Sequence, residues 1–108
     1  MVIPDGVRSG VRAAAEVARA HDRIRDAEDG ARRRGALAAY RWALGRAHSA
    51  PLTGAAADGV PSLEALTAEV DASLVQLEAA TRPSVGREYI QGVHDALAWV
   101  CGHSDTRP

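Results

Sequence analysis

Residues 84–102 carry the widest continuous apolar surface in the sequence. On a helix with about 100° of rotation per residue, their apolar side chains and glycines cover an arc of roughly 200°, and the polar side chains cover the remainder. A helix that lies on a single neighbour needs an apolar stripe of only about 100°. The sequence therefore predicts a central helix over 84–101 that contacts at least two other helices, with Gly102 suited to ending it.

Further helices are predicted over about 7–33, 36–48 and 62–80 from the spacing of apolar residues. The boundary between the first two rests on Gly30 and Gly35, each of which weakens a helix by roughly 1 kcal/mol relative to alanine. The apolar stripe also changes direction there, by about 160°. One continuous helix over 7–48, with different neighbours along its two halves, is the alternative. Turn-forming residues predict a loop over 49–61, and the polar residues 103–108 a frayed tail.

The segment 62–80 has a narrow seam of large aliphatic residues, which are Leu63, Leu66, Val70, Leu74 and Leu77. Acidic residues recur every seven positions along one flank of this seam: Glu64, Asp71 and Glu78. An arginine row has the same spacing: Arg12, Arg19 and Arg33. We expect the seam to pack on a neighbouring helix and the two charged rows to pair within the chain. Because residues 81–83 suit a short turn, the last two helices should form an antiparallel hairpin.

Composition favours helices that pack closely through small side chains. The hydrophobic fraction of 46% consists largely of alanine, there is no phenylalanine, and only 4% of the residues are aromatic. A sheet-backed core usually needs bulkier residues. The predicted fold is therefore all-α, a small bundle of three to four helices that forms a single domain over 1–108.

Charge is distributed unevenly, although the formal net charge is only −1. Residues 1–48 contain ten arginines and six acids, a balance of +4, whereas residues 49–108 contain three arginines and eight acids, a balance of −5. Either the two halves pack on each other, or a basic face is left for a partner. All 13 basic residues are arginine, which indicates a GC-rich coding genome rather than a function.

The sequence predicts neither an enzyme nor a bound cofactor. The best group of metal-binding residues is His94, Cys101 and His103, but His94 and Cys101 would lie about 10 Å apart along one helix, too far to share an ion. The lone cysteine, the lack of a secretory leader and the lack of a long apolar run predict a cytoplasmic protein without membrane contact.

The predicted function is that of a non-catalytic interaction or regulatory module, which forms homo-oligomers or binds a protein partner. A small nucleic-acid-binding regulator is the alternative, because arginines alternate with aromatic residues in the region 32–46. The candidate partner-binding residues are Arg32, Arg33, Arg34, Arg41, Trp42 and Arg46. Trp42 lies off the main apolar stripe, so it either packs beneath the 49–61 loop or forms an exposed anchor for a partner.

Overall fold

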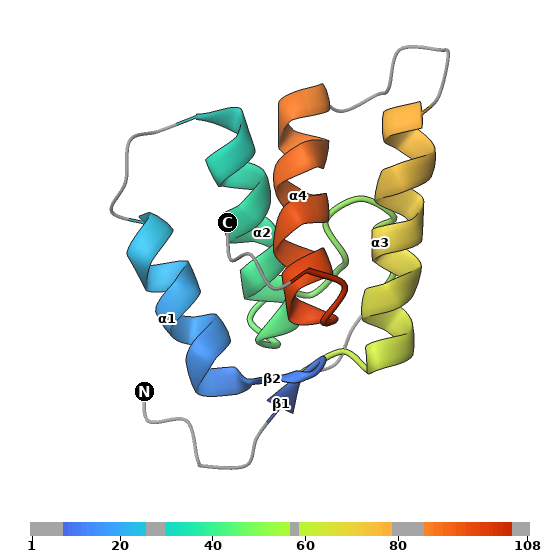
Figure 1. The fold of residues 1–108 in the computed structure, drawn as a ribbon. Helices are drawn as coiled ribbons and strands as arrows, with labels where there is room; N and C mark the ends of the chain where they lie inside the picture. Colours follow the sequence, from blue (N-terminus) through green and yellow to red (C-terminus); the bar gives the residue numbers. More distant parts are fainter. Residues whose placement is uncertain (1–7, 26–29, 57–58, 79–85, 105–108) are drawn as a thin grey trace.

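The computed structural model describes residues 8–25, 30–56, 59–78 and 86–104 (Figure 1). These residues form four helices: α1 (Ala14–Arg25), α2 (Ala31–Ala43), α3 (Leu63–Glu78) and α4 (Arg87–Val100). They also form a small antiparallel hairpin of two strands, β1 (Arg8–Ser9) and β2 (Arg12–Ala13). The fold is mostly helical, as predicted, but the hairpin makes the all-α expectation incomplete.

Helix α4 holds the largest share of buried residues. Eight of its positions are buried: Ile90, Gly92, Val93, Ala96, Leu97, Ala98, Trp99 and Val100. It packs against both α2 and α3 and lies between them in Figure 1. It ends as the sequence predicts, because Gly102 takes a φ of 78° and the N–H groups of Gly102 and His103 donate to the carbonyl oxygens of Trp99 and Ala98. Residues 84 and 85 of the predicted helix lie outside the described part of the chain.

Helices α2 and α4 run in the same direction (Figure 1), and their backbones approach closely at two glycines. A Cβ atom at Gly35 would collide with the carbonyl oxygen of Tyr89, and one at Gly92 would collide with that of Arg32. Alanines follow four residues after each glycine, at Ala39 and Ala96, and both are fully buried. Small residues at this spacing let two helix backbones come into direct contact. Gly35 is therefore a contact residue inside α2, and the predicted helix boundary beside it is wrong.

The predicted helix over 7–33 is wrong at both ends. Residues 8–13 form the hairpin, whose turn requires Gly10 at a φ of 63°. Helix α1 ends at Arg25 and α2 begins at Ala31, so the chain forms two helices with their boundary before Gly35. Helix α2 also ends earlier than the predicted residue 48, because Gly45 takes a φ of 78° and its N–H donates to the carbonyl oxygen of Trp42.

The hairpin covers the C-terminal ends of α2 and α4, which lie side by side because these helices are parallel. Ser9 Oγ donates to the carbonyl oxygen of Ala43 at 2.7 Å, and the Val11 N–H donates to that of Val100 at 3.0 Å. The Arg12 guanidinium donates to the carbonyl oxygen of Trp99 at 2.9 Å and lies 4.8 Å from the centre of the Trp99 ring. Carbonyl groups that lack partners within a helix are thereby paired, and a positive charge lies near the two negative helix ends.

Helix α3 runs opposite to α4 in Figure 1, and its predicted seam is only partly buried. Leu66 and Val70 are buried against the core, but Leu63 and Leu74 are 47% and 40% exposed. The buried positions of α3 are Leu66, Glu69, Val70 and Ser73. The buried face of α3 is therefore rotated away from the predicted seam and includes the polar residues Glu69 and Ser73. The spacing of apolar residues alone does not predict this orientation.

Candidate interaction surface

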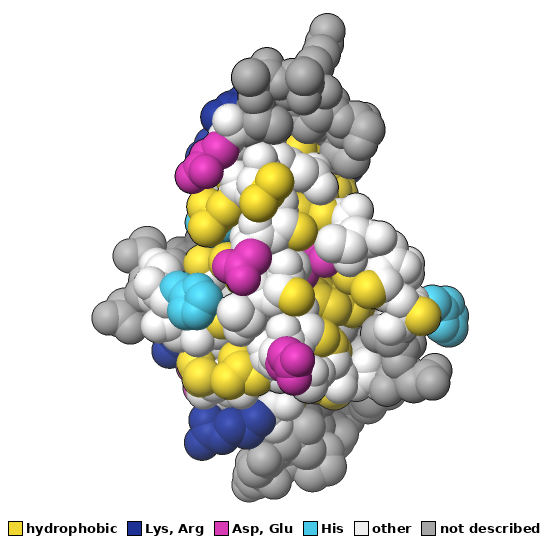
Figure 2. Space-filling model, turned by 90° about the vertical axis from the view of Figure 1, so that its right-hand side faces the viewer, with side chains coloured by type: hydrophobic (Ala, Val, Ile, Leu, Met, Phe, Trp, Pro, Cys, Tyr) yellow, Lys and Arg dark blue, Asp and Glu magenta, His cyan; other side chains and the backbone are white. Residues whose placement is uncertain are grey.

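The outward face of α3 combines exposed aliphatic side chains with acids. Val75 is 67% exposed, and Leu63 and Leu74 are the other large apolar residues exposed on this helix. Three acids share this exposed part of α3: Glu64, Asp71 and Glu78. Figure 2, which views the molecule from the α3 side, shows hydrophobic and acidic side chains over this face and basic ones only near its margins. We call these six residues the α3 face.

The charged rows do not pair as the sequence predicts. Arg12 is held at the end of α4, and Arg33 contacts the end of α1. Within the described ranges, no ion pair joins an arginine to the acids of the α3 face. The negative charge on α3 therefore remains on the surface.

A groove of about 580 Å³ runs between α3 and α4 beside this face. Its apolar lining comes from Val70, Leu74 and Ala98, and its polar lining from Asp71, His94, Asp95, His103 and Ser104. His94 and His103, which the sequence brought together with Cys101, thus share the groove, whereas Cys101 is buried beside Thr67. In the described part of the chain, no group of three or more His, Cys, Asp or Glu residues is arranged to hold a metal ion.

The hydrogen bonds of Ser73 fix the orientation and tautomer of His94. Ser73 Oγ donates its single proton to the carbonyl oxygen of Val70 at 2.6 Å. The 3.0 Å contact between Ser73 Oγ and His94 Nδ1 must therefore be donated by the imidazole N–H. In the neutral ring, His94 Nε2 is then a hydrogen-bond acceptor. The sequence offered no signal for this pair.

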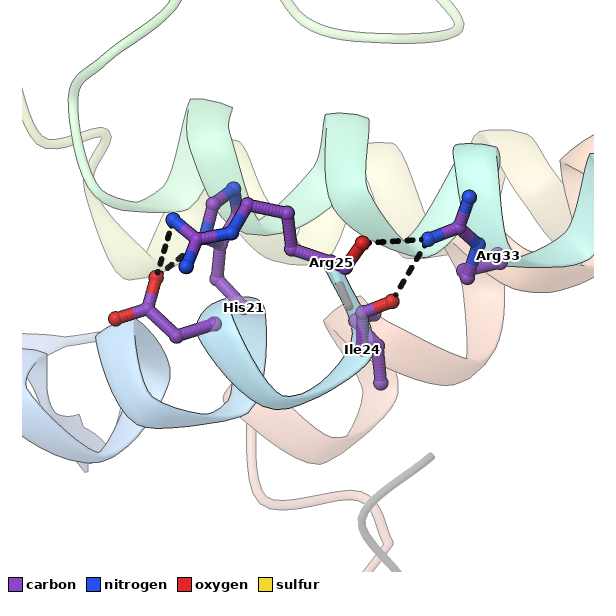
Figure 3. Close-up of polar contacts among 5 residues, drawn as sticks. His21, Ile24, Arg25 and Arg33 are labelled. Atoms are coloured by element: carbon purple, nitrogen blue, oxygen red, sulfur yellow. Dashed lines mark hydrogen bonds and ion pairs between the residues drawn. The ribbon is translucent and has the colours of Figure 1, made fainter. Parts of the chain in front are cut away.

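Arg32 and Arg33, two of the candidate arginines, contact other residues in the described part of the chain. Arg33 Nη1 donates to the carbonyl oxygens of Ile24 and Arg25, at 3.0 and 2.8 Å, and so pairs the last carbonyl groups of α1 (Figure 3). Arg32 forms a surface ion pair with Glu88, with 3.1 Å between Nε and Oε2, which links α2 to α4. Arg33 therefore connects α2 to α1, and Arg32 connects α2 to α4.

The other three candidate arginines are exposed. Arg34 and Arg41 are seven residues apart on α2, and Arg46 follows the end of that helix. These three, which we call the arginine face, retain the basic character of the predicted site.

Trp42 does not belong to the arginine face. It is 2% exposed and is among the largest fully buried side chains of the core, and it shares a cavity lining with loop residues such as Ala50 and Thr53. Of the two alternatives for this residue, the structure supports packing beneath the 49–61 loop.

On α1, the carboxyl group of Asp22 accepts a hydrogen bond from His21 Nδ1 at 3.0 Å and lies 3.5 Å from Arg25 Nη1. The His21 hydrogen bond is the main cause of the lowered pKa of Asp22; burial opposes it, and the positive charge of Arg25 adds a smaller lowering effect. Asp22 is thus held in its charged form at the edge of the basic half of the molecule.

Two groups near α4 have raised pKa values. Burial is the main cause of the raised pKa of Cys101, and the negative charge of Asp71 adds to it, while the Thr67 hydrogen bond opposes it. Burial also raises the pKa of Tyr89, with a further contribution from the charge of Glu69. Both shifts favour the neutral form, so Cys101 lacks the environment that activates a cysteine nucleophile.

Comparisons with protein-family models, with curated proteins and with solved structures find no match for this chain. None of the helices within the described ranges combines the length and the apolar character that crossing a bilayer requires.

Proposed function

We propose that the protein is a non-catalytic helical interaction module that associates with further copies of itself. The α3 face carries this proposal, because it exposes three large aliphatic side chains next to acids that lack ion-pair partners among the described residues. Leu74 and Val75 are adjacent and Leu63 lies three turns earlier on the same helix, and exposed apolar surface of this kind supports an interaction site.

The acids argue for a basic counterpart. Two α3 faces placed against each other would bring like charges together, which is unfavourable. The arginine face offers the opposite charge on another part of the same chain, so we expect the α3 face of one copy to contact the arginine face of the next. A contact between two different surfaces is heterologous, and it produces rings or open chains rather than a closed two-fold dimer.

Light scattering after gel filtration tests this proposal with two charge reversals, Asp71→Arg on the α3 face and Arg41→Asp on the arginine face. Each variant alone should be monomeric, because one of its two surfaces is blocked. An equal mixture should associate again, since the intact α3 face of one variant can contact the intact arginine face of the other, and the two reversed faces are also opposite in charge. Glu16→Arg, on α1, is the matched control and should assemble like the unmodified chain.

A monomeric unmodified chain across the accessible concentration range would refute self-association. A stable dimer that neither charge reversal disrupts would refute the pairing of these two faces. Raised salt should weaken the assembly without abolishing it, because the aliphatic contacts are less sensitive to screening than the ionic ones.

Nucleic-acid binding is the second candidate, and the exposure of Arg34, Arg41 and Arg46 favours it. Arginine side chains at the surface can bind phosphate groups without sequence preference. A gel-shift assay with random duplex and single-stranded oligonucleotides at low salt tests it. Retardation that Arg41→Asp reduces and Asp71→Arg does not would support this function, and no retardation at micromolar protein would refute it.

A further inference from the structure

The groove between α3 and α4 contains one carboxylate from each helix. Asp71 lies on α3 and Asp95 on α4, and both line the groove. Within the described ranges neither carboxylate has an ion-pair partner; Asp95 Oδ1 accepts a hydrogen bond from a neutral donor, Gln91 Nε2, at 2.8 Å. Like charges that share a confined space repel each other, and a cation between them relieves this repulsion. The groove therefore favours a positively charged occupant.

His94 adds an uncharged hydrogen-bond acceptor to these two carboxylates. Because Ser73 Oγ accepts the N–H at Nδ1, Nε2 of the neutral ring is left as the acceptor, and no described residue donates to it. An arginine guanidinium matches such a set of acceptors, since it carries five N–H donors in a planar fork and has no acceptor of its own. The apolar part of the lining can hold the aliphatic stem of the same side chain; it consists of Val70, Leu74 and Ala98. An arginine side chain therefore fits the groove better than a lysine or a neutral group.

Within the arginine face, Arg41 is the residue best suited to occupy the groove. It is exposed on α2, and its guanidinium has no hydrogen-bond or ion-pair partner among the described residues. By contrast, Arg34 interacts within its own chain, and the charge of Arg46 acts on Asp22. Helices α2 and α3 lie on opposite sides of α4 in Figure 1, so Arg41 is separated from the groove of its own chain. The groove of a second copy remains open to it.

We propose that Arg41 of one copy inserts its guanidinium into the α3–α4 groove of the next copy, where it donates hydrogen bonds to Asp71 and Asp95. This inference rests on the self-association proposed above and identifies its anchor. It also extends the contact beyond the α3 face, because Asp95 and His94 belong to α4. The exposed aliphatic side chains of the α3 face lie beside the groove and keep water from the ion pairs.

Sedimentation velocity at pH 8, where histidine is mostly neutral, measures the concentration at which half of the chains are associated. Asp95→Asn removes one charge from the groove, keeps an oxygen that can accept from Gln91, and should raise this concentration about tenfold, as the loss of a charge-assisted hydrogen bond implies. Arg41→Gln should raise it at least as much. Glu64→Gln, on the α3 face but outside the groove, should raise it less than about threefold. Arg19→Gln removes another exposed arginine, on α1, and is the matched control that should leave it unchanged.

The double variant Arg41→Gln with Asp95→Asn tests whether these two residues meet. It should associate about as strongly as Arg41→Gln alone, because both changes remove the same contact. Losses that multiply to about a hundredfold would overturn the proposal, since Arg41 would then bind elsewhere. Unchanged association in Asp95→Asn would also overturn it and leave the proposed self-association intact. A tenfold loss in Asp95→Asn with none in Arg41→Gln would show that another cation occupies the groove. A monomeric unmodified chain would refute the proposed function and this inference together.

Discussion

The close approach of α2 and α4 predicts that Gly35→Ala lowers the free energy of unfolding. The sign of this change shows whether Gly35 acts as a helix-contact residue or only as a poor helix former. If Gly35 merely weakened the helix, Gly35→Ala would stabilise the protein by about 1 kcal/mol, because alanine is the better helix former. The structure predicts the opposite, since the new Cβ would collide with the carbonyl oxygen of Tyr89, a backbone atom that cannot turn aside. The helices would have to separate.

The expected magnitude follows from these two opposing effects. Extra atoms in a well-packed core cost about 1–3 kcal/mol, and collision with backbone places Gly35→Ala near the upper value. After subtraction of the gain in helix propensity, a net loss of about 2 kcal/mol in the free energy of unfolding remains. At about 4 °C per kcal/mol for a chain of this length, the melting temperature should fall by about 8 °C. Gly92→Ala should behave in the same way, because its Cβ would collide with the Arg32 carbonyl oxygen.

Thermal and urea unfolding followed by circular dichroism measure both changes. Gly86→Ala is the control, since Gly86 is the N-cap of α4 and a Cβ there would meet no atom within 4 Å; the weaker capping by alanine should cost at most about 1 kcal/mol, less than either helix-contact variant. If Gly35→Ala and Gly92→Ala were as stable as the unmodified chain, or more stable, the close helix contact would be refuted.

Three further predictions concern single side chains. Arg12→Ala should lower the free energy of unfolding by about 2 kcal/mol in urea titrations, because it removes hydrogen bonds at the end of α4 and the contact with the Trp99 ring; a change below about 0.5 kcal/mol would contradict this role. Glu69→Gln should cost about 1–3 kcal/mol in the same assay, since an amide cannot accept all three donors of the loop, whereas Glu64→Gln on the surface should have little effect. The raised pKa of Cys101 predicts slow alkylation by iodoacetamide at pH 8 in the folded protein, with a rate that still rises at a pH where the urea-unfolded chain has reached its plateau. Equal rates in the folded and unfolded chains would contradict it.

The helical content could be predicted from the sequence because long amphipathic segments have a strong period. The clearest case is the segment 84–101, whose apolar arc corresponds to the buried positions of α4. The hairpin at 8–13 was missed because strands of two residues have no period, although Gly10 followed by Val11 is a typical two-residue hairpin turn.

Long-range packing explains the remaining differences. Gly35 was interpreted as a helix breaker because the sequence shows the intrinsic cost of glycine but not the backbone of Tyr89 beside it. The seam predicted for α3 only partly overlaps the buried face of the helix. No local sequence signal indicates that the Glu69 carboxylate accepts hydrogen bonds from the 49–56 segment and is buried there. Of the six candidate partner-binding residues, Trp42 is buried, and the structure assigns internal contacts to Arg32 and Arg33.

The parallel pairing of α2 with α4 also has a consequence for how the chain folds. The two helices that form the most extensive contact are separated in sequence by α3 and the 49–61 loop, and the hairpin at residues 8–13 rests on the ends of both. During synthesis, α2 and the hairpin therefore leave the ribosome well before α4, the helix against which both of them pack. Contacts between residues distant in sequence slow folding, so we expect this small helical protein to fold more slowly than a bundle of consecutive hairpins. Until α4 is made, the earlier segments expose apolar surface that a chaperone could bind.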